Sequence, residues 1–151
     1  MVKGVDVSEF QGEVDWARAK AAGVGFAMLR AGYGKGNADA RFAANAAACS
    51  ALSIPFGAYW FGYPLSVSDA EKEAAYCAEA LKSCRITFPV AYDFEYNSVA
   101  WCVKNGVTAD GAFATACAKA FCEGVRKAGY PPAVYTNADF AERMFDLSAL
   151  S

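Results

Sequence analysis

Short apolar runs alternate along the chain with longer segments rich in alanine and charged residues. The apolar runs show no regular alternation with polar residues, which is typical of strands buried on both faces of a parallel sheet. Five strands are predicted, at Lys3–Val7, Phe26–Ala31, Phe56–Phe61, Phe88–Phe94 and Ala133–Thr136. Four helices are predicted between them, at Asp15–Ala22, Ala38–Leu52, Ser68–Ser83 and Thr108–Ala128. This order predicts an α/β fold in which helices cover a parallel sheet.

Capping residues mark several of the predicted helix ends. Ser68 is followed three residues later by Glu71, a capping-box pattern, and Thr108 or Asp110 can cap the fourth helix. Gly23 and Gly129 stand where a helix is expected to stop. No linker or repeat divides the chain, so residues 1–151 are expected to form a single domain.

Two topologies fit this pattern, a (β/α) barrel and an open doubly wound sheet, and five strands are too few to close a barrel of the usual eight. The open sheet predicts a glycine-rich phosphate loop after the first strand, but the segment Ser8–Glu13 is acidic and lacks that motif. The glycine-rich segment Gly32–Gly36 follows the second strand without an immediate helix start. A phosphate site is therefore the weaker expectation.

Composition excludes several classes of partner. The net charge is −2 and no Lys/Arg-rich block occurs, so a nucleic-acid partner is not expected. The longest apolar stretches, such as Pro55 to Phe61, are shorter than the roughly 20 residues of a membrane span. The first residues carry no signal-peptide pattern.

The chain has no histidine and six cysteines. Without histidine, Ser-His-Asp and Cys-His nucleophiles are excluded, and acid–base chemistry falls to Asp, Glu, Tyr, Lys or Cys. No two cysteines show the close spacing of a structural zinc site, so most are expected to be buried free thiols.

Carboxylates gather at the carboxyl ends of two predicted strands. Asp93 and Glu95 end the fourth strand, two residues apart and therefore on one face, and Asp6 ends the first. Two close carboxyls disfavour double ionisation, which raises one pKa and suits a general acid beside a charged group. Two alternatives stay open: Glu95 merely caps a helix or lies in a solvated loop, or the three residues bind a divalent metal.

Aromatic residues are concentrated around the same strand ends. Aromatic rings are natural platforms for the apolar faces of sugar rings, although for any single ring a place in the core is the commoner role. The residues concerned are Tyr59, Phe61, Tyr63, Tyr96, Trp101 and Tyr135.

Several segments together resemble glycoside hydrolase family 25, a family of lysozymes. They are Gly4–Trp16, Phe26–Gly34, Gly57–Phe61, Asp93–Glu95 and Tyr135–Asn137. The resemblance runs along nearly all of the chain and implies a TIM-like (β/α) barrel. It also implies hydrolysis, with retention, of the β-1,4 bond between N-acetylmuramic acid and N-acetylglucosamine in peptidoglycan, without metal or cofactor. Such an enzyme acts at the cell wall, outside the cell.

The resemblance assigns roles to individual residues. Glu95 is implied as the general acid, Asp93 as the residue that orients the substrate's N-acetyl group, and Asp6 as a supporting carboxylate. The attack by the N-acetyl group replaces an enzyme nucleophile, so carboxylate spacing does not predict stereochemistry here. The residues expected to bind substrate are Tyr59, Phe61, Tyr63, Arg30, Tyr135 and Asn137.

The chain stops before the last strands and a further active-site aspartate that the family pattern would supply. Five strands leave open sheet edges, and an open edge favours pairing with another chain, so the chain is expected either to form a homodimer or to be poorly stable. Two alternatives to an active lysozyme follow: a carbohydrate-binding remnant without turnover, and a metal-dependent hydrolase that uses Asp6, Asp93 and Glu95.

Overall fold

A five-stranded parallel sheet forms the centre of the molecule. The structure is a computed structural model and describes residues 1–150. The strands lie in the order β1-β2-β4-β5-β6, and the two-residue β3 pairs antiparallel with the end of β2. Their bounds are β1 Lys3–Val7, β2 Val24–Tyr33, β3 Asn37–Ala38, β4 Phe56–Phe61, β5 Val90–Asp93 and β6 Pro132–Tyr135. The five predicted strands are confirmed, and the sheet is open, with one neighbour each for β1 and β6.

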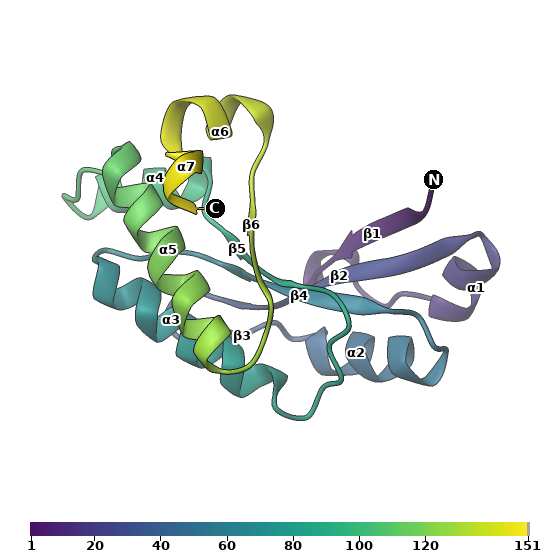
Figure 1. Cartoon of the computed structure of the whole chain (residues 1–151). Helices are drawn as coiled ribbons and strands as arrows, with labels where there is room; N and C mark the ends of the chain where they lie inside the picture. The colour runs from purple at the N-terminus through teal and green to yellow at the C-terminus, as the bar shows by residue number, and fades with distance from the viewer. Residues whose placement is uncertain (151) are drawn as a thin grey trace.

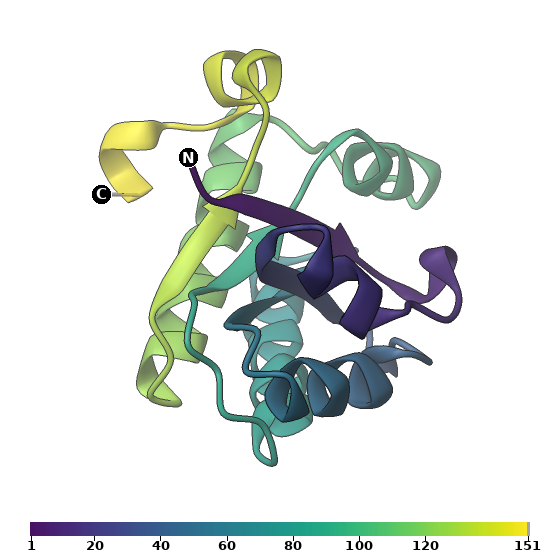
Figure 2. The ribbon, with the colours of Figure 1, turned by 90° about the vertical axis from the view of Figure 1, so that its right-hand side faces the viewer.

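Helices cover one face of this sheet. Figure 1 shows α2, α3 and α5 on the same side, whereas α4, α6 and α7 gather beyond the ends of β5 and β6. Seen after a quarter turn, α3 and α5 run side by side behind the strands (Figure 2). The bounds are η1 Glu9–Gln11, α1 Trp16–Ala21, α2 Phe42–Ala51, α3 Val67–Leu81, α4 Tyr96–Lys104, α5 Gly111–Lys127, α6 Ala138–Met144 and α7 Leu147–Leu150. The four predicted helices are confirmed, but α4, α6 and α7 were not predicted.

The core lies between the helices and one face of the strands. Alternate strand residues, among them Leu29, Trp60 and Tyr92, are almost fully buried there. Tyr92 stacks on Phe121 of α5 with ring centroids 4.4 Å apart. The intervening strand residues point to the other face, which these helices leave uncovered, because successive side chains of a strand alternate.

Helix ends agree in part with the sequence. Gly23 and Gly129 end their helices with φ of 93° and 94°, values that favour glycine, and Asp110 caps α5. The capping box expected at Ser68 is wrong: the N-cap residue of α3 is Ser66, two residues earlier, and its side chain accepts a hydrogen bond from the Asp69 N–H. Ser66 provides the same cap chemistry, so the pattern identified the element and misplaced its first turn.

The six cysteines are free thiols, and four of them are buried. Burial raises the pKa of Cys49 to about 11 and that of Cys77 to about 12. Such thiols behave as small apolar residues, as expected. Within residues 1–150, no helix is both long and apolar enough to cross a membrane.

Candidate active site

The strand register aligns four residues at the carboxyl end of the sheet. Tyr33 of β2 lies opposite Phe61 of β4, Phe61 lies opposite Asp93 of β5, and Asp93 lies opposite Tyr135 of β6. Residues opposite one another in neighbouring strands share a face, so the four form one row. This row is on the face that α2, α3 and α5 leave uncovered.

Asp93 is the buried carboxyl of this row. Only 7% of its surface is exposed, and among residues 1–150 its Oδ1 is the one buried side-chain oxygen or nitrogen without a hydrogen-bond partner. Burial, followed by the negative charges of Glu95 and Asp6, raises the pKa of Asp93 to about 8 against the opposing charge of Arg30. The carboxyl is therefore uncharged at neutral pH, as expected for one member of a close pair.

Glu95 lies just beyond the strand. β5 ends at Asp93, and Glu95 is the N-cap residue of α4, with its backbone N–H donating to the Ser98 hydroxyl at 3.2 Å. The expectation that both carboxyls belong to one strand is therefore wrong. The backbone of Glu95 is at a helix N-cap, as the helix-capping alternative predicted. The side chain is half-buried, and its charge still acts on Asp93.

Three tyrosines surround the two carboxyls. The pKa values of Tyr59, Tyr63 and Tyr135 are all raised, in each case chiefly by burial and in part by the charge of Asp93. Tyr59 also donates a hydrogen bond to Asp6, which brings the end of β1 to the same place. The structure thus brings together Asp6, Asp93 and three of the predicted substrate-binding residues.

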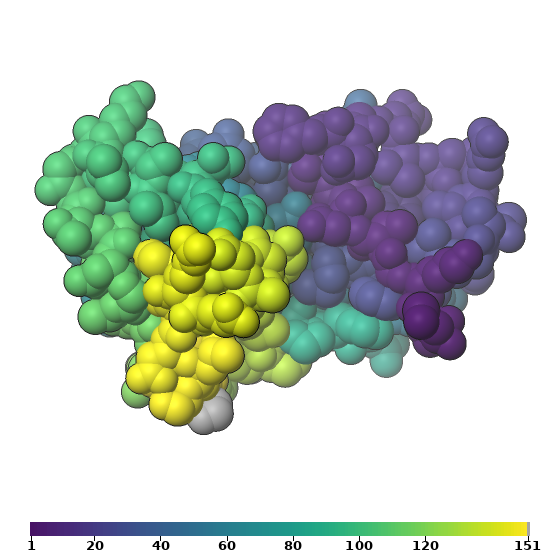
Figure 3. Space-filling model, turned by 90° about the horizontal axis from the view of Figure 1, so that it is seen from above, coloured from purple at the N-terminus to yellow at the C-terminus, as the bar shows by residue number. Residues whose placement is uncertain are grey.

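A cleft borders the row of strand-end residues. One cavity of about 320 Å³ is lined by Glu9, Phe10, Arg30, Tyr33, Phe61, Tyr63 and Asn97. A second of about 440 Å³ is lined by Tyr33, Gly34, Lys35, Asn37, Tyr63 and Trp101. Tyr33 and Tyr63 line both, and their rings meet edge to face with centroids 6.5 Å apart. Figure 3 looks onto this face, with the N-terminal residues on one side and the C-terminal helices on the other.

The structure bears on two expectations from the sequence, a phosphate site at Gly32–Gly36 and substrate binding by Asn137. The glycine-rich segment Gly32–Gly36 lines the second cavity and leads into β3, and α2 starts only at Phe42. This arrangement does not give the helix N-terminus that a phosphate site needs. Asn137, expected to bind substrate, has its side-chain oxygen engaged by the Phe140 N–H at 2.8 Å as the cap of α6.

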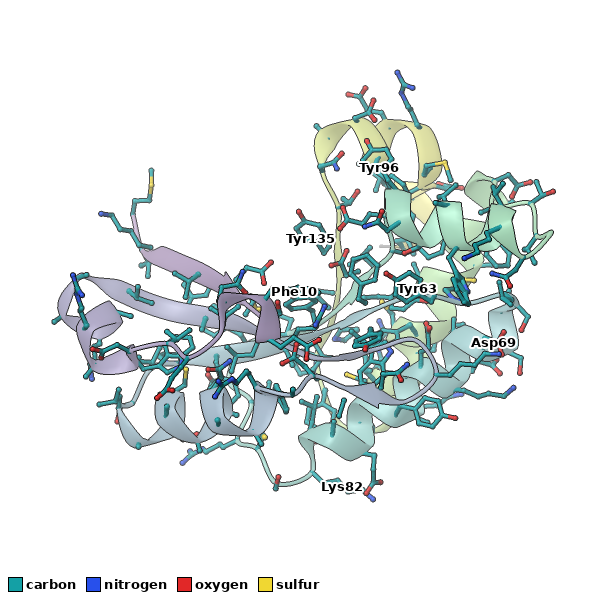
Figure 4. All side chains as sticks on the ribbon, turned by 180° about the vertical axis from the view of Figure 1, so that it is seen from behind. Phe10, Tyr63, Asp69, Lys82, Tyr96 and Tyr135 are labelled. Atoms are coloured by element: carbon teal, nitrogen blue, oxygen red, sulfur yellow. The ribbon has the colours of Figure 1, made fainter. Side chains whose placement is uncertain are left out.

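Phe10 is a wall residue that sequence reasoning missed. It is 80% exposed, and it lines the same cavity as Tyr63 (both labelled in Figure 4). The signal was available in the sequence, since an aromatic residue in an otherwise acidic loop after a strand has no core to fill.

Arg30 organises the loop that carries Phe10. Its Nη2 lies 2.8 Å from Glu9 Oε1 and its Nε lies 2.8 Å from Asp39 Oδ2. The guanidinium also lies 4.8 Å from the centroid of the Phe10 ring. Arg30, expected to bind substrate, lines the first cavity, and its two ion pairs hold η1 against the end of β2.

We expect Arg30→Met to destabilise the protein by about 3–5 kcal/mol, because it leaves the buried Asp39 carboxylate without its cation. Urea denaturation measures the change. Arg143→Met is the matched control: its ion pair with Asp139 is exposed, so a loss below about 1 kcal/mol is expected. Equal losses in the two variants would contradict this role of Arg30.

A metal centre has no support from the geometry. Across residues 1–150, no group of three or more Cys, Asp or Glu side chains is arranged to hold a metal ion. Asp6, Asp93 and Glu95, the three residues of the metal-dependent alternative, do not form such a group.

Comparison with known proteins identifies the family. A sequence model of glycosyl hydrolases family 25 matches residues 5–151. The chain belongs to this family. Lysozyme M1 of Streptomyces globisporus is 36% identical over 99 residues, which cover 64% of this chain and 33% of that protein.

Solved structures of family 25 proteins have the same fold. The modular autolysin LytC of Streptococcus pneumoniae aligns with a TM-score of 0.80 and 25% identity over 93% of this chain and 33% of its own. A family 25 lysozyme from Aspergillus fumigatus aligns with a TM-score of 0.76 and 25% identity over 95% of this chain and 68% of its own. The TIM-like fold is thus confirmed, here with an open sheet. The chain spans about a third of the length of Lysozyme M1 and LytC.

Proposed function

We propose that this chain carries the active site of an N-acetylmuramidase. The proposed reaction is hydrolysis of the β-1,4 bond between N-acetylmuramic acid and N-acetylglucosamine in peptidoglycan. The observation that carries the proposal is Asp93, a buried carboxyl with an unpaired oxygen, two residues from Glu95 and beside an aromatic-walled cleft. Family membership supports the glycosidase chemistry, and LytC has been solved in complex with a synthetic peptidoglycan ligand.

In the free enzyme the proton of the carboxyl pair lies on Asp93. When the substrate's acetamido N–H reaches Asp93 Oδ1 it favours the ionised form of Asp93, so the proton passes to Glu95. In the proposed first step, Glu95 donates this proton to the glycosidic oxygen as the bond from that oxygen to the sugar C1 breaks. The carbonyl oxygen of the substrate's own acetamido group forms the new bond to C1, and Asp93 Oδ1 accepts the acetamido N–H. The unpaired, desolvated oxygen of Asp93 suits this role, because a buried acceptor without a partner costs about 1–3 kcal/mol until a donor reaches it.

In the proposed second step, the carboxylate of Glu95 takes a proton from water as the water oxygen attacks C1 and the acetamido ring opens. The two displacements at C1 give net retention of configuration. Asp6 and Tyr59 form a hydrogen-bonded pair that supports the other carboxyls. The aromatic walls provide platforms for the sugar faces: Phe61 and Tyr63 from the predicted set, together with Phe10 and Trp101. Tyr135, which lies opposite Asp93 in the next strand and is 46% exposed, is a further platform.

Digestion of purified bacterial cell walls tests the proposal. We expect falling turbidity and soluble fragments whose new reducing ends are N-acetylmuramic acid, identified by borohydride reduction and mass spectrometry. New N-acetylglucosamine ends would overturn the bond assignment. Binding of muropeptides without turnover would favour the carbohydrate-binding alternative. The cell wall, outside the membrane, is the proposed place of action.

We also propose that the open edges of β1 and β6 pair with a second copy of the chain. The support is that each of these strands has one neighbour in the sheet, which leaves backbone groups available for pairing. Light scattering after size exclusion measures the mass in solution, and a monomer at high concentration would overturn the dimer.

A further inference from the structure

One carboxyl outside the row of strand-end residues is buried in the core. Glu73 of α3 is 1% exposed and lies on the helix face that also carries Ala70, Ala74 and Cys77. Its Oε1 accepts the backbone N–H of Tyr63 at 2.8 Å, and its Oε2 accepts the hydroxyl of Tyr92 at 2.6 Å. A buried carboxyl is retained without large penalty only when it is hydrogen-bonded in this way. The chemistry proposed above makes no use of it.

The first partner of Glu73 places it directly behind the cleft. Tyr63 follows β4, and its ring lies 5.1 Å from that of Phe61 and 5.7 Å from that of Trp101. Tyr63 lines both cavities, so the position of its ring fixes the wall that they share. Glu73 holds the backbone of this residue from the core side.

The second partner connects Glu73 to the catalytic strand. Tyr92 immediately precedes Asp93, and the Asp93 carbonyl oxygen accepts the N–H of Gly62 at 2.8 Å. A Cβ on Gly62 would lie 2.5 Å from the Tyr92 hydroxyl, so glycine lets this hydroxyl pass the loop to reach Glu73. The Cys102 thiol of α4 donates to the Pro64 carbonyl at 3.1 Å, which holds the same loop from its other side.

We propose that Glu73 is a positioning residue that sets sugar binding by anchoring Tyr63 against Trp101. It acts through the loop 62–64 and through Tyr92, and it does not touch substrate. The inference rests on the proposed function. It adds that affinity for the glycan depends on a carboxyl in the helix layer, on the opposite side of the sheet from the cleft.

The surroundings of Glu73 fit an anchor. The titratable groups that act on it or respond to its charge are Tyr92, Asp69, Cys102 and Cys117. Burial raises its pKa to about 7, although the bonds from Tyr92 and Tyr63 lower it. Protonated or ionised, the carboxyl keeps an oxygen that accepts the Tyr63 N–H.

Steady-state kinetics with three variants test the anchor. Glu73→Met fills the same space without hydrogen bonds, and we expect KM to rise about tenfold with kcat within about threefold of wild type. Glu73→Gln keeps an oxygen for Tyr63 and should restore KM to within about threefold. Glu79→Gln lies on the same helix, 70% exposed, and serves as the unchanged control. A Glu73→Met enzyme that is folded and has wild-type KM overturns the proposal.

A further variant, Glu73→Asp, tests the anchor if Glu73→Met does not fold. Glu73→Asp keeps the carboxyl but is one methylene shorter, so it cannot hold both partners at their present distances. We expect its KM to rise as well, and a folded Glu73→Asp enzyme with wild-type KM overturns the proposal in the same way.

Tryptophan quenching gives a readout that needs no substrate. Of the three tryptophans, Trp16 and Trp60 are at most 4% exposed, whereas Trp101 is 37% exposed, so acrylamide quenching reports chiefly on Trp101. We expect stronger quenching in Glu73→Met and Glu73→Asp and wild-type quenching in Glu73→Gln. Unchanged quenching in all three overturns the anchor even if the enzyme is active. Stronger quenching in Glu73→Met and Glu73→Asp, together with a wild type that neither cleaves nor binds muropeptides, retains the anchor and refutes the proposed function.

Discussion

Glu95→Gln is expected to lower kcat for cell-wall hydrolysis by about 10²–10⁴-fold. The amide has no proton to give to the glycosidic oxygen, and general acid catalysis is typically worth this factor. KM should change little, because the side chain keeps its shape and its place at the start of α4. Initial rates of turbidity loss and of reducing-end release measure the effect.

Glu142→Gln is the matched control for Glu95→Gln. Glu142 lies on α6, is exposed and lines neither cavity of the cleft, so the same chemical change should leave the rate unchanged. Thermal melts of both variants show whether the cap of α4 tolerates the amide. Wild-type turnover by a folded Glu95→Gln protein would refute the role of Glu95 as acid.

Asp93→Asn is expected to lower kcat about 10²-fold and also to stabilise the protein at alkaline pH. The rate falls because the amide can neither pass a proton to Glu95 nor provide the negative charge that Asp93 carries once substrate is bound, as positive charge develops on the acetamido group. The gain in stability has a separate cause: the folded state holds the Asp93 proton up to about pH 8, whereas an exposed aspartate loses it near its ordinary pKa of 3.8.

The stability difference between wild type and Asp93→Asn depends on pH, because the pKa of Asp93 is raised in the folded state. A raised folded-state pKa means that the contribution of Asp93 is fully present below about pH 4 and is lost as the pH rises through about 8. Asparagine does not titrate, so the two proteins should melt alike at pH 4. At pH 8 the variant should melt higher by roughly 5–10 °C, for a difference of a few kcal/mol. If the difference in Tm between wild type and Asp93→Asn stays constant from pH 4 to pH 8, Asp93 is not desolvated.

The parallel sheet and the helices that cover it were predictable because their signal is local. Unalternating apolar strands such as Phe56–Phe61 and an amphipathic segment such as Thr108–Ala128 identify the layers without knowledge of contacts. The helices α4 and α6 were missed because each begins at a strand end rich in polar and aromatic residues. There the residues Glu95 and Asn137 were interpreted as chemistry when they also cap helices.

The site was predictable to the extent that it depends on strand ends. Asp93, Phe61 and Tyr135 were expected there, and the register places them in one row. What sequence could not give is which carboxyl is desolvated, since burial depends on contacts from several elements at once. Glu73 was also missed, although its position between Ala70 and Ala74 on an apolar helix face was a usable signal.

The uncovered face of the sheet allows recognition and stability to evolve separately. Phe10 and Tyr135 are 80% and 46% exposed, so replacing either removes little core packing. Substitutions at such positions usually change stability by less than about 0.5 kcal/mol. Lineages that meet different wall chemistries can therefore exchange these rings freely, while the helix layer and its buried carboxyl stay fixed. A mutational library confined to Phe10 and Tyr135 should keep most members folded, and their substrate preferences should diverge.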